Sequence, residues 1–140
     1  MLRSIAALIF SSVIFISCNS ADKKVGGDEP MSETNVAIAF IRGLLDNKLD
    51  DAEKYLLKNE ENQQYFDALK AQYKRKSPEE LEKFKNADIN FSENPSYVTD
   101  SVCIISYSNS YNPQVKNKLK LVRIKGKWLV DFQYTFSGNM

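Results

Sequence analysis

Residues 116–136 read KNKLKLVRIKGKWLVDFQYTF, in which apolar and polar residues alternate on either side of Lys125 and Gly126. Alternation with a period of two is typical of a β-strand with one buried face, and a short turn that contains glycine joins two such strands into a hairpin. The stretch therefore predicts an antiparallel pair of strands that turns at Lys125 and Gly126.

This turn implies a register in which opposed residues share a chemical character. On the first face the opposed pairs are Leu119 and Phe132, Leu121 and Val130, and Arg123 and Trp128. On the second face they are Lys118 and Gln133, Lys120 and Asp131, and Val122 and Leu129. A slip of one residue would exchange the two faces, so the pattern favours a single register. We expect Lys120 and Asp131 to lie opposite each other, on the face away from Trp128.

The chain ahead of the hairpin predicts helices first and strands later. Apolar residues recur at helical spacing within residues 36–45, 52–56, 65–73 and 81–84. Residues 87–94 and 97–110 then change to strand periodicity, one strand each. This order predicts an α+β fold, with N-terminal helices packed on a curved antiparallel sheet of about four strands.

The expected helix ends have recognisable capping residues. Ser32 or Thr34 can cap the first helix, and Asn47 suits the left-handed conformation at its end. Ser77 precedes a proline and stands three residues before Glu80, which is the spacing of a capping box. These signals support the helical assignment independently of the apolar pattern.

Two stretches, AIAFIRGLLDNKLDDAEKYL at 37–56 and KLVRIKGKWLVDF at 120–132, carry a family resemblance. Together they resemble the cystatin-like or nuclear transport factor 2-like (lumazine-binding-like) domains of small bacterial lipoproteins of unknown function. The resemblance implies a cone-shaped fold with a pocket between the helices and the concave sheet face, and a possible homodimer through the open sheet face. It implies no particular activity, because this fold hosts many functions.

The N-terminal residues predict export and lipid attachment. Arg3 precedes an apolar run at 5–16 that is shorter than the ~20 residues needed to span a bilayer, as in a signal peptide. Ser17 and Cys18 follow, and the segment resembles a bacterial lipoprotein signal, in which the cysteine receives lipid. We expect a signal peptide at 1–17, a lipidated Cys18 and flexible tether at 18–32, and one domain at 33–140. The implied location is the cell envelope, anchored to a membrane on the periplasmic side or the cell surface.

Composition excludes several classes of function. The chain has no histidine, which removes Ser-His-Asp triads, Cys-His pairs and histidine-containing zinc sites. It has no glycine-rich phosphate-binding motif, and we expect no cofactor. The chain has 19 Lys and Arg and 18 Asp and Glu. Loss of Arg3 with the signal peptide would leave equal numbers of the two charges, so no nucleic-acid partner is predicted.

The candidate pocket residues are aromatic, with one cation: Arg123, Trp128, Phe132, Tyr134 and Tyr107. Trp128, Phe132, Tyr134 and Phe136 alternate on one expected strand face, as a ligand-lining wall or plain core would. Arg123 can orient a carboxylate or lie across Trp128. An enzymatic site would draw on Tyr107, Tyr134 or Asp100, but no spacing links them, and no catalytic residue or metal ligand is assigned.

Three functions remain open. The chain is a non-enzymatic envelope lipoprotein that binds a small apolar ligand or an envelope protein partner, a structural interaction module with a filled core, or an isomerase-like or hydratase-like enzyme. The space between the first helix and the last strand distinguishes them.

Replacing Cys18 tests the N-terminal assignment. Cys18→Ser should abolish labelling of the protein by radioactive fatty acid and leave an uncleaved or released product, because serine has no thiol for the transfer of lipid. Normal processing and membrane retention of the variant would contradict the lipoprotein assignment.

Overall fold

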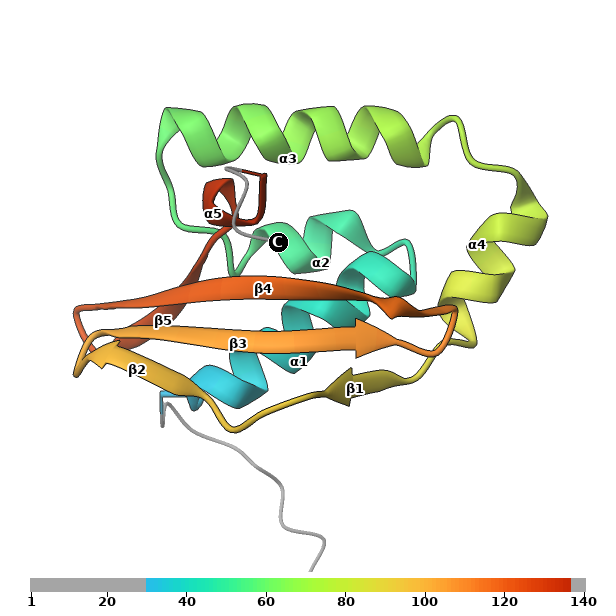
Figure 1. Cartoon of the computed structure of the whole chain (residues 1–140). Coiled ribbons are helices and arrows are strands. Elements are labelled where there is room, and N and C mark those ends of the chain that lie inside the picture. Colours follow the sequence, from blue (N-terminus) through green and yellow to red (C-terminus); the bar gives the residue numbers. More distant parts are fainter. Residues whose placement is uncertain (1–29, 137–140) are drawn as a thin grey trace, which may run out of the picture.

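The computed structural model describes residues 30–136. It confirms an α+β fold, in which four helices precede an antiparallel sheet (Figure 1). The helices are α1 (Glu33–Leu45), α2 (Leu49–Glu53), α3 (Glu60–Tyr73) and α4 (Pro78–Lys85). The strands are β1 (Ile89–Phe91), β2 (Ser96–Thr99), β3 (Val102–Asn109), β4 (Asn112–Ile124) and β5 (Lys127–Asp131), and a short helix α5 (Gln133–Phe136) follows. The predicted signal peptide, Cys18 and most of the predicted tether lie outside the described residues.

The sheet has five strands, one more than expected. Four of them follow the order β1-β3-β4-β5, and β2 also pairs with β3. The prediction of a single strand at 97–110 is wrong, because the chain turns at Asp100 and Ser101 and forms two strands, β2 and β3. The Ser101 backbone N–H donates to Thr99 Oγ1 at 3.2 Å within this turn. Both β1 and β2 pair with β3, so together they make one interrupted edge of the sheet.

The predicted register of the β4–β5 hairpin is confirmed where the two strands pair. The opposed residues are Lys120 and Asp131, Leu121 and Val130, Val122 and Leu129, and Arg123 and Trp128. Lys125 and Gly126 form the turn with φ of +50° and +79°, the positive values that two-residue hairpin turns favour. Lys120 Nζ lies 2.9 Å from Asp131 Oδ2, so the expected ion pair is present.

The strand ends earlier than predicted. The pairs Leu119–Phe132 and Lys118–Gln133 are absent from the ladder, because the chain enters α5 after Phe132. Fully buried Asn62 of α3 causes this ending, since its Oδ1 accepts the Gln133 backbone N–H at 2.8 Å and its Nδ2 donates to Asp131 at 3.3 Å. Placing Tyr134 on the strand face with Trp128 was therefore wrong.

The helices begin and end as the capping residues predict. Ser32 accepts the Asn35 backbone N–H, and Asn47 has a φ of +56° just after α1. Ser77 and Glu80 form the complete capping box of α4. Gly43 allows α1 and α2 to pack closely, because a Cβ there would lie 3.0 Å from the Ala52 Cβ.

The core fills the space between the helices and the inner face of the sheet. Helix α1 lies behind the strands in Figure 1 and buries its apolar stripe against them. Phe132 packs edge-on between Phe40 and Phe66, with ring centroids 5.5 and 5.7 Å away. The fully buried aliphatic side chains around them are Ile41, Leu56, Ile105, Leu119, Leu121 and Val130. The pocket expected between the first helix and the last strand is therefore occupied by side chains.

Truncating the central ring tests this description of the core. Phe132 is 3% exposed, so Phe132→Ala should lower the free energy of unfolding by about 3–5 kcal/mol through lost burial and a residual cavity. Val98→Ala is the control, because Val98 is 61% exposed and should change stability by less than about 0.5 kcal/mol. Equal effects of the two variants in urea denaturation would contradict the filled core.

Candidate functional site

A half-enclosed hollow with a largely apolar lining lies at one end of the sheet, outside the filled core. It has a volume of about 300 Å³ and lies between the start of α1, the segment that follows α2, and β5. Its lining residues are Pro30, Met31, Val36, Lys54, Tyr55, Lys127, Trp128 and Leu129. We call it the Trp128 pocket.

Trp128 comes to this pocket through the hairpin register. It lies on the inner face of β5, one pair away from the turn, and is 7% exposed. The Arg123 guanidinium carbon lies 5.3 Å from the centroid of the indole ring, and the Tyr97 ring lies 6.5 Å away on another side. These contacts hold the indole in place, so that the pocket wall is pre-formed rather than assembled by a ligand.

The opposite wall is tied to the sheet by backbone hydrogen bonds. The Val130 N–H donates to the Tyr55 carbonyl at 2.8 Å, and the Leu57 N–H donates to the Val130 carbonyl at 2.9 Å. The segment after α2 therefore covers the outer edge of β5 as a short parallel bridge. This arrangement places Tyr55 beside Trp128 and leaves the cationic side chains of Lys54 and Lys127 among the lining residues.

Met31 and Val36 complete the pocket at the start of α1. Ser32 is the N-cap, so Met31 stands just before the cap and Val36 four residues into the helix, the positions of a hydrophobic staple. Sequence reasoning assigned Met31 to the tether and did not include either residue in the pocket. The staple spacing was the signal that could have identified them.

The residues predicted to line one pocket are found in three different places. Trp128 and Arg123 lie together at the end described above. Phe132 and Tyr107 both lie in the buried core. Tyr107 is on β3, and burial raises the pKa of its hydroxyl. Tyr134 lies on α5, with Lys120 Nζ 5.6 Å from its ring centroid. The structure thus brings together two of the five predicted pocket residues.

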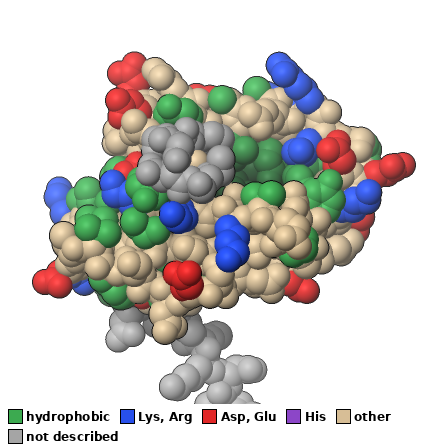
Figure 2. Space-filling model, in the orientation of Figure 1, with side chains coloured by type: hydrophobic (Ala, Val, Ile, Leu, Met, Phe, Trp, Pro, Cys, Tyr) green, Lys and Arg blue, Asp and Glu red, His purple; other side chains and the backbone are tan. Residues whose placement is uncertain are grey.

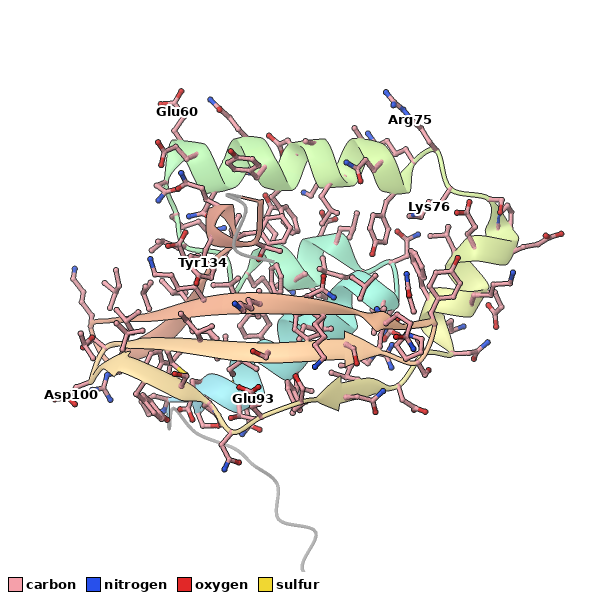
Figure 3. The ribbon with its side chains drawn as sticks, viewed as in Figure 1. Glu60, Arg75, Lys76, Glu93, Asp100 and Tyr134 are labelled. Carbon is pink, nitrogen blue, oxygen red and sulfur yellow. The ribbon has the colours of Figure 1, made fainter. Side chains whose placement is uncertain are left out.

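The groups considered for acid–base or nucleophilic chemistry do not converge. Asp100 is at the tip of the β2–β3 turn, whereas Tyr134 lies beneath α3, well separated from it in Figure 3. Cys103 is fully buried, and burial raises the pKa of its thiol to about 11, opposite to the shift that activates a cysteine nucleophile. The described lining of the Trp128 pocket includes no carboxylate and no thiol, and its titratable side chains are Lys54, Tyr55 and Lys127.

A second hollow, of about 560 Å³, lies between α2 and the C-terminal half of α3. One of its cations is engaged, because Lys70 Nζ contacts both Glu53 and Asp50. Burial raises the pKa of Tyr73, which lines this hollow, to about 12. Figure 2 shows apolar side chains recessed between α3 and the sheet on this side of the molecule. The lining of this hollow is more polar, with Lys48, Lys70 and Lys74 beside Asp50 and Asp51, so it suits an apolar ligand less well than the Trp128 pocket.

Comparison of the chain with protein-family models, with curated proteins and with solved structures finds no match. Within residues 30–136, no helix combines the length and apolar character needed to cross a membrane.

The contact between Arg123 and Trp128 can be tested directly, because Trp128 is the one tryptophan of the chain. Arg123→Ala should lower the free energy of unfolding by about 0.5–1 kcal/mol and shift the tryptophan emission to longer wavelength, because one indole face loses its cover. Arg123→Lys, which keeps a cation, should have a smaller effect on both. Unchanged emission in the alanine variant would show that Arg123 does not cover the indole in solution.

Proposed function

We propose that this protein is a lipid-anchored envelope protein whose domain binds a small apolar or amphipathic ligand in the Trp128 pocket, without catalysis. The observation that carries the proposal is the pre-formed pocket itself, with Met31, Val36 and Leu129 as aliphatic walls beside the indole. Its volume of about 300 Å³ is at the lower end of the range for small-molecule sites, which are concave, mostly apolar and few per protein.

The charged residues favour an amphipathic anion over a neutral hydrocarbon. Lys54 and Lys127 are both exposed and both line the pocket. Lys54 also contacts Asp51 at 2.6 Å, so Lys127 is the better candidate to receive a ligand carboxylate. A short alkyl chain in the apolar part and a carboxylate at the rim would satisfy both kinds of lining residue.

The envelope location and the family assignment rest on sequence. The apolar run ahead of Cys18 supports lipid attachment, and the resemblance at 37–56 and 120–132 supports a cystatin-like or nuclear transport factor 2-like domain. The position of α1 across the inner face of the sheet is compatible with such a cone. The space between the helices and the inner face of the sheet is packed, however, so the proposed ligand binds at the end of the sheet.

A second candidate function, the structural module, is favoured by the filled core. Under that alternative the Trp128 pocket is an incidental surface hollow that no ligand occupies with useful affinity. The isomerase-like or hydratase-like alternative has no comparable support, since Tyr107, Tyr134 and Asp100 lie in different parts of the fold.

Titration of the purified protein with octanoate, followed by Trp128 emission, tests the proposal. We expect a saturable change in emission, because the indole forms one wall of the pocket. Met31→Asp should weaken binding at least about tenfold, since a carboxylate in the pocket wall would replace an apolar contact with the alkyl chain and repel the ligand charge. Val98→Asp, with the same change of charge at an exposed position outside the pocket, should bind as the parent does.

A titration with octanol, which has no carboxylate, measures the contribution of Lys54 and Lys127. We expect octanol to bind more weakly than octanoate. An emission that never saturates with octanoate, or that changes equally in Met31→Asp and Val98→Asp, would contradict ligand binding and support the structural module.

A further inference from the structure

The outer face of the sheet, which no described helix α1–α4 covers, carries an apolar patch at the end near the Trp128 pocket. The patch consists of Val98, Val102, Ile104, Val122, Ile124 and Leu129, and we call it the outer-face patch. Val102, Val122 and Leu129 lie in one row across three strands. Val98 and Ile124 are 61% and 46% exposed. Figure 2 faces this side and shows apolar side chains next to basic ones.

The strands that carry the patch are strongly basic. Across β1–β5 the cations are Lys116, Lys118, Lys120, Arg123 and Lys127, and Asp131 is the one carboxylate. On β4, Leu119 and Leu121 face inward. Lys118, Lys120 and Val122 alternate with them, so the two lysines lie on the outer face with the patch. Asp131 is already engaged by Lys120 and Asn62. The face therefore combines aliphatic side chains with a local excess of positive charge, although the whole chain is nearly neutral.

We infer that the outer-face patch and its lysines dock onto an anionic phospholipid bilayer. Aliphatic side chains would enter the boundary between headgroups and acyl chains, and the lysines would contact lipid phosphates, the combination by which amphipathic surfaces bind membranes. A second copy of the chain is a poorer occupant, because two faces with the same excess of lysine would repel each other.

The position of the N-terminal segment favours the same occupant. Pro30 and Met31 line the Trp128 pocket, so the preceding 29 residues join the domain at the end of the sheet that carries the patch. This step rests on the proposed membrane anchoring, since an anchor within residues 1–29 would hold this end of the sheet near a bilayer at high effective concentration.

Labelling of the full chain on vesicles tests the inference. Ile124→Cys places an environment-sensitive fluorophore in the patch, and Glu79→Cys places it on exposed α4 as the matched control. The parent chain, labelled in parallel, corrects for any reaction at Cys18, and buried Cys103 should not react. The chains are reconstituted into vesicles of phosphatidylcholine alone or with phosphatidylglycerol, and retention is measured by sedimentation.

We expect the label at position 124, but not at 79, to shift its emission to shorter wavelength and to be quenched by spin-labelled lipid on vesicles with phosphatidylglycerol. High salt, or the change Lys118→Glu at an outer-face position away from the Trp128 pocket, should reduce this response at least severalfold, because both remove electrostatic attraction. The ligand titration with octanoate is independent of this response, so failure of one can be distinguished from failure of the other.

Three results would overturn the inference. Equal responses at 124 and 79 on retained chains would mean that the face does not touch the bilayer. A response at 124 that depends on protein concentration and not on lipid charge would identify a second copy as the occupant. Absence of the chain from sedimented vesicles would contradict both the docking face and the membrane anchor.

Discussion

Both residues of the turn between β4 and β5 have positive φ, +50° at Lys125 and +79° at Gly126, which gives the hairpin the twist that strands favour. The turn sets the opposed pairs, and the pairs decide which side chains face the helices. With this register Leu121 and Val130 enter the core, Trp128 closes its end, and Lys120 meets Asp131 on the other side. A slip of one residue would bury charged side chains and expose the indole, at a cost that no other contact in the domain offsets.

The packed interior explains why the binding site proposed for this domain lies at an end of the sheet. Three phenylalanines from α1, α3 and the end of β5 meet at centroid distances of 5.5–6.1 Å, leaving the inner face without room for a ligand. The end of the sheet is different, because the start of α1, the chain after α2 and β5 meet there around a hollow that no side chain of residues 30–136 fills. Ligand binding and membrane contact are thus proposed for the same end of the molecule, where Lys127 and Leu129 border both sites.

Local features could be predicted from sequence, and features that depend on distant residues could not. The hairpin register and the Ser77–Glu80 capping box depend on residues close in sequence; the capping box and four of the six predicted hairpin pairs are confirmed, and Ser32, one of two predicted caps, is the cap of α1. The end of β5 depends on Asn62, 71 positions before its partner Gln133, and nothing in the local pattern indicates it. The candidate site was only partly predicted for the same reason. Trp128 and Arg123 are neighbours in the hairpin, whereas Tyr55 is held beside β5 because its carbonyl accepts the Val130 N–H. The turn at Asp100 and Ser101 was missed although it is local.

Nuclear Overhauser spectroscopy of the backbone protons tests the register most directly. Because the core, the Trp128 pocket and the outer-face patch all follow from it, cross-strand contacts should join Leu121 to Val130 and Arg123 to Trp128. Contacts that join Leu121 instead to Leu129 or to Asp131 would show a shifted register, and would contradict the assignment of both faces of the sheet.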